Sequence, residues 1–273
     1  MTIEMIKLDT ILLCGRAKID DELLLYMREK TGQKEVDNKA LFEIAGKKIL
    51  HYICDVLNEA ENIGNIFIAG LSKEDIEFDY PVTYLELSKE SSVVDKVFTW
   101  VNEYLLKRDK PETPVLIVNG DIPTISKESI NWIAEKVSES TATFQYTVVG
   151  QEDMDRVFPN SRRSFTKFKD GAICGGDVVG IAPVDILKHA DTWQKLVGRR
   201  KSFIRQVIFV APFKVFKIML GRATLDDAVH IAEKALKMRF NLMKVPYPEI
   251  AMDIDKPHQF DIVEKHLSQK RRT

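Results

Sequence analysis

Two kinds of hydrophobic pattern alternate along the first 150 residues of the chain. Short apolar runs between turn-forming residues are typical of buried strands, and apolar residues at intervals of three and four are typical of helices that bury one face. The runs predict strands at Thr10–Cys14, Asn65–Gly70, Pro81–Leu87, Pro114–Asn119 and Ala142–Val149. The helical spacing predicts helices at Lys47–Glu61, Ser91–Lys107 and Ser126–Glu139. This alternation predicts an α/β fold of three layers, with a mostly parallel central sheet and helices on both faces.

The pattern changes after Gly150, where strands and helices no longer alternate one by one. The later elements that we expect are two strands around a turn, a helical region, an extended segment and a final helix, at Phe165–Lys169, Ile173–Gly180, 183–238, Lys244–Asp253 and Pro257–Leu267. No low-complexity linker divides the chain. We therefore expect a single domain over residues 1–273 with a helical insertion at 183–240.

Composition and charge narrow the class of protein. The chain has 273 residues, 45% of them hydrophobic, and its 40 basic and 41 acidic side chains give a net charge of −1. This composition excludes a wholly disordered chain, and the net charge near zero argues against a protein that binds nucleic acid over its whole surface. The cysteines, Cys14, Cys54 and Cys174, are widely spaced and odd in number, as in reduced thiols. With neither a signal-peptide core nor a membrane-spanning segment in the sequence, we expect a cytoplasmic protein.

Several common catalytic motifs are absent from the sequence. No GxGxxG follows the first strand, and there is no GxxxxGK[ST], HExxH or GxSxG. Their absence argues against a Rossmann dinucleotide site, a P-loop, a zinc peptidase and a serine hydrolase. In a mostly parallel sheet, ligands bind beyond the carboxyl ends of the strands. The loops after Leu13, Ala69 and Val118 are therefore the expected positions of a site.

Three segments carry the candidate chemistry. They are the loop Cys14-Gly15-Arg16 with Lys39 farther along, the segment Asn119-Gly120-Asp121-Ile122-Pro123, and the segment Asp253-Ile254-Asp255-Lys256-Pro257. Each also has a structural explanation by itself. Asp121 is compatible with a turn before Pro123, the two later aspartates with helix capping, and Lys39 with a surface loop. Their order along the chain is more specific than any one of them.

That order resembles the nucleotidyltransferases of the glycosyltransferase-A type, which include the molybdenum-cofactor guanylyltransferases. The family's loop after the first strand resembles Leu12–Arg16, its lysine segment resembles Asn38–Leu41, and its GDxP and DIDTPEDL motifs resemble Gly120–Pro123 and Asp253–Phe260. The resemblance extends from about residue 10 to residue 267. One departure is plain, since the double glycine of the family's loop is reduced to Cys14-Gly15 and its second GxR unit is missing.

The resemblance implies a Mg²⁺-dependent transferase that joins the NMP group of an NTP to a phosphorylated small-molecule acceptor and releases pyrophosphate. It assigns catalytic roles to Lys39 and Asp121 and Mg²⁺ binding to Asp121, Asp253 and Asp255. The nucleotide-binding residues that it implies are Leu13, Cys14, Gly15, Arg16, Lys39, Ser92, Asn119 and Gly120. For the acceptor we expect Arg162, Arg163, Gly175 and Gly176. In an extended segment, residues two apart face the same side, so Asp253 and Asp255 are expected to share one cation.

Alternatives remain at this point. A glycosyltransferase with a nucleotide-sugar donor shares the fold but normally shows two acids where this chain has Asp121 alone. A nucleotide-binding protein without catalysis would fit the altered glycine loop. A separate feature is Trp193–Arg222, which is basic and apolar and contains no acid. It is compatible with a helical subdomain, with a cover over the acceptor, or with a helix that contacts an anionic membrane or a lipid-linked acceptor.

Overall fold

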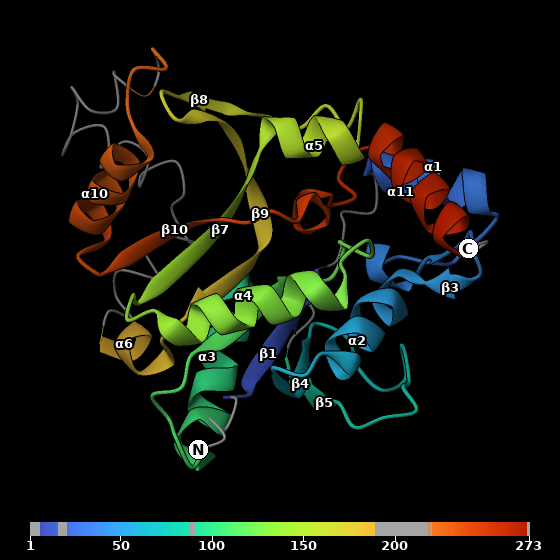
Figure 1. Ribbon diagram of the computed structural model, residues 1–273. Helices are drawn as coiled ribbons and strands as arrows, with labels where there is room; N and C mark the ends of the chain where they lie inside the picture. Colours follow the sequence, from blue (N-terminus) through green and yellow to red (C-terminus); the bar gives the residue numbers. More distant parts are fainter. Residues whose placement is uncertain (1–5, 16–20, 88–90, 189–217, 219, 272–273) are drawn as a thin grey trace.

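The computed structural model describes residues 6–15, 21–87, 91–188, 218 and 220–271 (Figure 1). Within these residues, an 8-stranded sheet has the order β10-β7-β9-β6-β1-β4-β5, and β8 pairs with β9. Its strands are β1 (Leu8–Leu13), β4 (Ile63–Ala69), β5 (Thr83–Leu85), β6 (Val115–Asn119), β7 (Phe144–Gly150), β8 (Thr166–Phe168), β9 (Gly171–Ile181) and β10 (Phe240–Lys244). A separate hairpin joins β2 (Glu43–Ile44) to β3 (Lys47–Lys48).

The sheet is mixed but mostly parallel, as the sequence predicts. Strand β1 pairs in parallel with both β4 and β6, β4 pairs in parallel with β5, and β10 pairs in parallel with β7. Strand β9 runs antiparallel to β6 and β7. Strand β1 is buried along its whole length. Because it lies between β4 and β6 and runs parallel to both, its carboxyl end lies beside theirs.

Helices cover both faces of the sheet. The described helices are α1 (Glu22–Thr31), α2 (Ile49–Glu59), α3 (Val93–Tyr104), α4 (Lys127–Glu139), α5 (Gln151–Val157), α6 (Pro183–Lys188), α10 (Leu225–Leu236) and α11 (Pro257–Lys270). Single turns of 3-10 helix are η1 (Lys39–Leu41), η2 (Leu105–Lys107) and η3 (Pro248–Ala251). The predicted three-layer α/β architecture is confirmed.

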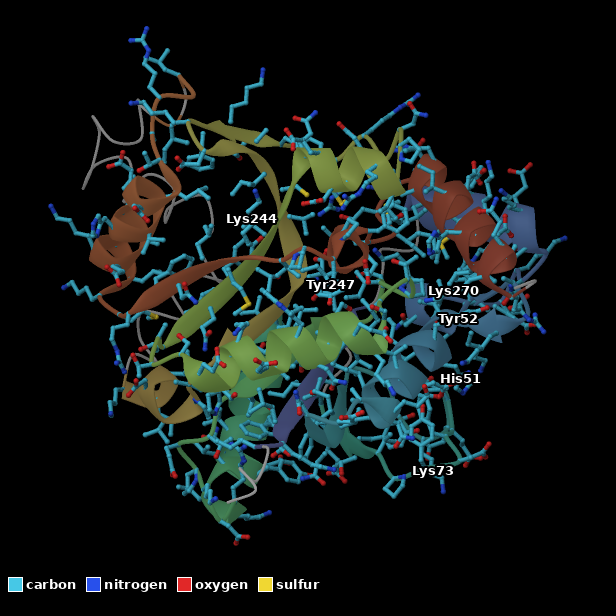
Figure 2. All side chains as sticks on the ribbon, in the orientation of Figure 1. His51, Tyr52, Lys73, Lys244, Tyr247 and Lys270 are labelled. Atoms are coloured by element: carbon cyan, nitrogen blue, oxygen red, sulfur yellow. The ribbon has the colours of Figure 1, made fainter. Side chains whose placement is uncertain are left out.

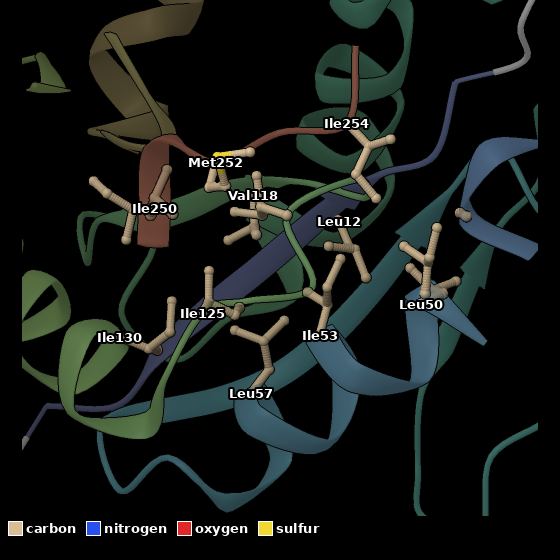
Figure 3. Close-up of a cluster of buried hydrophobic side chains, with 14 of the residues drawn as sticks. Leu12, Leu50, Ile53, Leu57, Val118, Ile125, Ile130, Ile250, Met252 and Ile254 are labelled. Carbon is tan, nitrogen blue, oxygen red and sulfur yellow. The ribbon is translucent and has the colours of Figure 1, made fainter. Parts of the chain in front are cut away.

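Side chains that alternate along β1 build two hydrophobic cores. Leu8 and Leu12 belong to the larger core, which α1, α2, α4 and α11 cover. Ile11 and Leu13 point to the other face and belong to a smaller core around Trp100 of α3. Figure 3 shows part of the larger core, with Leu12 of β1, Val118 of β6 and side chains of α2 among its members. The strict alternation on β1 is what a strand with helices on both faces requires.

Side-chain hydrogen bonds cap two helices and join a third to the neighbouring hairpin. Ser92 and Ser126 cap α3 and α4, and each takes part in a reciprocal capping box. The side chains of α2 are shown in Figure 2, where Tyr52 is labelled. Its hydroxyl donates to the carbonyls of Ile44 and Ala45, both at 3.1 Å, and so ties α2 to the β2–β3 turn.

The sequence-based element prediction is wrong at several places, and it also lacks β10 and the β2–β3 hairpin. Lys244–Asp253 is not one extended segment, because β10 ends at Lys244 and η3 follows from Pro248 to Ala251. Pro248 is the first residue of η3, where its fixed φ and missing N–H suit the start of a helical turn. Helix α5 was not predicted, since its 7 residues are too few to show a helical period.

Much of the predicted helical insertion at 183–240 lies outside the described residues. The described parts of it include α6 and α10. The basic segment 193–222 is outside them too, apart from residues 218 and 220–222. Among the helices that the structure describes, none is long and apolar enough to cross a membrane.

We expect Leu50→Ala to destabilise the protein by about 2–5 kcal/mol, because Leu50 is fully buried in the larger core and its truncation leaves a cavity. The matched control is Leu106→Ala, since Leu106 is 81% exposed and its truncation should change the free energy of unfolding by less than about 0.5 kcal/mol. Urea denaturation of the two variants measures both values. Equal midpoints would contradict this description of the core.

Candidate active site

The ends of β1 and β6 form the floor of the candidate site. Leu13 and Asn119 are register partners in the parallel pair, so the loops that follow them leave the sheet side by side. The backbone N–H of Gly120 donates to the carbonyl of Leu13 at 2.9 Å. A Cβ at Gly120 would lie 3.0 Å from that carbonyl and 3.1 Å from Cys14 Sγ. A side chain at this position would require the Leu13 carbonyl or Cys14 to shift by a few tenths of an ångström, so glycine suits this close approach of the two loops.

A cavity of about 620 Å³ opens beyond these strand ends. Its walls come from the two loops, from η1 and from the start of α3, and they include most of the predicted nucleotide-binding residues. The lining residues are Leu13, Cys14, Gly15, Asp21, Asn38, Lys39, Ala40, Val93, Lys96, Asn119, Gly120 and Asp121. This is the position at the carboxyl ends of parallel strands where the fold predicts a ligand.

Lys39 connects the three segments that the sequence singled out. Its Nζ donates to Asp121 Oδ2 at 2.8 Å, to the carbonyl of Ile254 at 2.8 Å and to Asp255 Oδ1 at 3.0 Å. Asn38 caps η1 and so fixes the base of this lysine. Burial disfavours the charged form of Lys39, but the carboxylates of Asp121 and Asp255 outweigh it and raise the pKa of the lysine.

Asp253 does not lie beside Asp255 as the sequence predicts. It is buried and forms an ion pair with Arg163, whereas Asp255 binds Lys39. The expectation assumed an extended strand, but the segment leaves the η3 turn, where Met252 has φ −106° and ψ 63°. Within the described residues, no group of three or more His, Cys, Asp or Glu side chains is placed to hold a metal ion. In this structure Asp253 therefore has a different partner from Asp121 and Asp255, and a cation shared by all three aspartates stays a prediction.

The predicted acceptor residues have structural partners. Arg163 binds Asp253 and donates to the carbonyl of Gly175 at 3.2 Å, while Arg162 is exposed. Added Cβ atoms at Gly175 and Gly176 would meet the side chains of Tyr146 and Thr147 on β7. The register shift of the β7–β9 pair falls at this place. Close packing of a bulged strand explains the paired glycines without an acceptor.

Of the two remaining predicted nucleotide-binding residues, only Ser92 is described, and it does not line the cavity. Arg16 lies outside the described residues. Ser92 is exposed, and its hydroxyl accepts from the N–H of Asp95 at 3.2 Å as the cap of α3. The structural explanation of Ser92 as a helix cap is the one that the structure supports.

The sequence analysis missed two side chains of the site, Lys96 and Asp177. Lys96 of α3 is only 6% exposed, and its Nζ donates to the carbonyl of Cys14 at 2.8 Å. A signal was available, because Lys96 stands one turn before the buried Trp100 and next to the buried Val97. Asp177 on β9 accepts from Asn119 Nδ2 at 2.7 Å. No local pattern marks Asp177, since only the pairing of β9 with β6 brings it to the site.

Comparison with known proteins finds a family model that matches part of the chain. Residues 31–166 match the cytidylyltransferase family model. A relative described as a probable molybdenum cofactor guanylyltransferase, from Aquifex aeolicus (strain VF5), is 25% identical over 118 residues. That alignment covers 42% of this chain and 55% of the relative, so the chain spans about half the length of the relative it matches.

Solved structures share the fold over nearly the whole chain. A hypothetical transferase from Thermus thermophilus has a TM-score of 0.76 at 20% identity, over 93% of this chain and 99% of that one. A CMP:2-keto-3-deoxy-manno-octonic acid synthetase complexed with CTP has a TM-score of 0.58 at 8% identity, over 97% and 99%. A 4-diphosphocytidyl-2C-methyl-D-erythritol synthase from Anaerococcus prevotii has a TM-score of 0.53 at 12% identity, over 97% and 99%.

At these identities the solved structures show the fold alone. The family is shown by the family match together with the order of the motifs. The resemblance to nucleotidyltransferases of the glycosyltransferase-A type, read first from the motifs of the sequence, is confirmed. The chain belongs to the cytidylyltransferase family of NTP transferases and is a distant relative of the molybdenum cofactor guanylyltransferases.

Proposed function

We propose that this protein transfers the NMP group of an NTP to a phosphorylated small-molecule acceptor and releases pyrophosphate. The observation that carries the proposal is the contact of Lys39 with both Asp121 and Asp255 at the cavity beyond β1 and β6. An acceptor phosphate oxygen attacks the α-phosphorus, the bond from that phosphorus to the bridging oxygen breaks, and pyrophosphate leaves with the bridging oxygen. Such a step needs charge neutralisation and alignment rather than a protein nucleophile.

Two carboxylates of the site, those of Asp121 and Asp255, are placed to hold a divalent cation together. Mg²⁺ is commonly held by one or two carboxylates together with substrate phosphates and water. Asp121 and Asp255 both reach one atom, Lys39 Nζ, within 3.0 Å, so their oxygens already surround a single cationic position. Mg²⁺ bound to these two carboxylates would neutralise the charge that develops on the phosphates.

Lys39 has a role of its own in this scheme. Without a nucleotide its ammonium is paired with the two carboxylates. A nucleotide in the cavity offers the ammonium phosphate oxygens in exchange for one or both of these partners. Lys39 then keeps its charge throughout, because its pKa is raised by the carboxylates in one state and would be raised by phosphates in the other.

The names of the relatives indicate which nucleotides to test first. The matched family model is described as cytidylyltransferase and the relative from Aquifex aeolicus as a probable guanylyltransferase. CTP and GTP are therefore the leading donors, with UTP and ATP as the comparison. Pyrophosphate release from each NTP with a panel of phosphorylated acceptors tests the proposal. Binding without release would instead support a nucleotide-binding protein without catalysis.

We expect Asp121→Asn and Asp255→Asn each to lower pyrophosphate release by at least about 100-fold, because each removes one carboxylate from the proposed cation site. Chelation of divalent cations with EDTA should abolish release by the unaltered protein. The control is Asp226→Asn, which changes an exposed aspartate on α10 and should leave the rate unchanged. Full activity of Asp121→Asn and Asp255→Asn would refute the assignment.

The carboxyl group of Asp177 changes its charge near neutral pH. Burial raises the pKa of Asp177 to about 7, and the nearby carboxylate of Asp121 adds to the rise while Arg163 opposes it. The pKa of an unfolded aspartate is about 3.9. Between these two values the folded state binds more protons than the unfolded state, so the contribution of Asp177 to stability declines as the pH rises through this window.

We therefore expect Asp177→Asn to weaken the pH dependence of stability. An amide at this position can still accept from Asn119 but does not ionise. Between pH 5 and pH 8 the free energy of unfolding of the unaltered protein should fall by about 2–3 kcal/mol relative to that of the variant. Urea denaturation at the two pH values measures this difference. Asp226→Asn should keep the pH dependence of the unaltered protein, and parallel behaviour of Asp177→Asn would contradict the raised pKa.

A further inference from the structure

Lys96 is a buried lysine in the wall of the nucleotide cavity. It belongs to the first turn of α3, and only 6% of it is exposed. Its one hydrogen-bond acceptor within the described residues is the carbonyl of Cys14, at 2.8 Å. An ammonium has three N–H donors. The side chain therefore has donors to offer to a ligand in the cavity that it lines.

Among the residues that the structure describes, no carboxylate lies beside the positive charge of Lys96. Lys39, in the same cavity, is paired with two aspartates, whereas no carboxylate of the described chain lies within ion-pair distance of Lys96 Nζ. A buried charge without a counter-charge is costly. Burial accordingly lowers the pKa of Lys96, with Cys14 as the opposing influence. An anion in the cavity would offset this cost.

The position of Lys96 on its helix also disfavours the charged form of the side chain. Lys96 lies four residues after the cap Ser92, in the first turn of α3. The amino end of a helix carries a partial positive charge, so an anion is favoured there and a cation is disfavoured. The one acid of this turn, Asp95, is exposed and receives the N–H of Ser92 in the capping box. Both costs would be relieved by a bound anion.

The neighbouring backbone makes room for the ammonium. Gly70 follows β4 with φ +110°, a conformation that favours glycine. A Cβ at this position would meet the carbonyl of Cys14 and would lie 2.8 Å from Lys96 Nζ. The end of β1, the end of β4 and the start of α3 therefore converge on the head of this one side chain. Such convergence distinguishes Lys96 from a lysine that is buried by accident.

We propose that Lys96 is a second phosphate-binding lysine of this site and donates to the anionic oxygens of the bound nucleotide. The inference rests on the proposed function, because the anion is the NTP substrate. It also offers a physical explanation for the reduced glycine loop. With Cys14-Gly15 in place of the family's double glycine, close approach of the backbone to phosphates is more restricted, and a lysine beside Cys14 supplies positive charge instead.

The test compares Lys96→Gln and Lys96→Met with the unaltered protein. Gln keeps a donor for the carbonyl of Cys14 but has no charge, and Met keeps the length of the side chain. The matched control is Lys73→Met, because Lys73 is exposed, with 71% of its side chain accessible. Isothermal titration calorimetry measures the affinity of each protein for CTP, GTP, their nucleosides and inorganic triphosphate.

We expect both Lys96 variants to bind the NTP and inorganic triphosphate about 10- to 100-fold more weakly, because one charge-assisted contact is lost. Nucleoside affinity and thermal midpoint should stay close to those of the control. Unchanged triphosphate affinity would overturn the proposal. An equal loss for NTP and nucleoside would also overturn it, since Lys96 would then only order the loop at Cys14.

These outcomes separate the proposal from the proposed function. If the unaltered protein binds NTP but releases no pyrophosphate with any acceptor, the proposed transfer fails while the Lys96 comparison still stands. If it binds inorganic triphosphate and the Lys96 variants do not, the anion site is supported independently of the base. If the unaltered protein binds neither NTP nor triphosphate, both proposals are refuted.

Discussion

The ammonium of Lys39 is the contact on which the site depends. It binds Asp121 after β6, Asp255 before α11 and the carbonyl of Ile254 between them. The backbone N–H of Ile254 in turn donates to the carbonyl of Asp121 at 3.1 Å. Segments more than 200 residues apart in the chain thus meet at one cation. Since like charges that are close together repel, these carboxylates need a cation between them, whether it is a lysine or a metal ion.

The same principle explains the other charged groups beneath the surface. Arg163 lies between Asp253 and Asp177 on the β9 side of the site, and Arg108 pairs with Asp9 at 3.1 Å at the far end of β1. Each of these buried charges has an opposite charge beside it, because an unpaired charge is costly in a medium of low polarity. Lys96 departs from this rule within the described residues, and it does so in the wall of the cavity.

The fold was readable from local patterns to a large extent. The buried strand β6 and the helix α4 with its Ser126 cap follow from short-range periodicity and capping, so their prediction is confirmed with shifts of a residue or two at the ends. The prediction of an extended segment at Lys244–Asp253 is wrong, because Pro248 starts a helical turn within it. That one local error changed the predicted geometry of the acids, since residues two apart share a face only in extended backbone.

The sequence by itself determined which chemical groups are present and where strands end. Lys39, Asp121 and Asp255 were identified as one site because their motifs follow the order of a known family, and the structure brings them into contact. Only the tertiary structure decided the partners of each charge. In the structure Asp253 pairs with Arg163. The pairing of β9 with β6 brings Asp177 to Asn119, and Lys96 donates to the carbonyl of Cys14. Charge pairing across a sheet depends on strand order and register, and these arise from contacts between residues far apart in the chain.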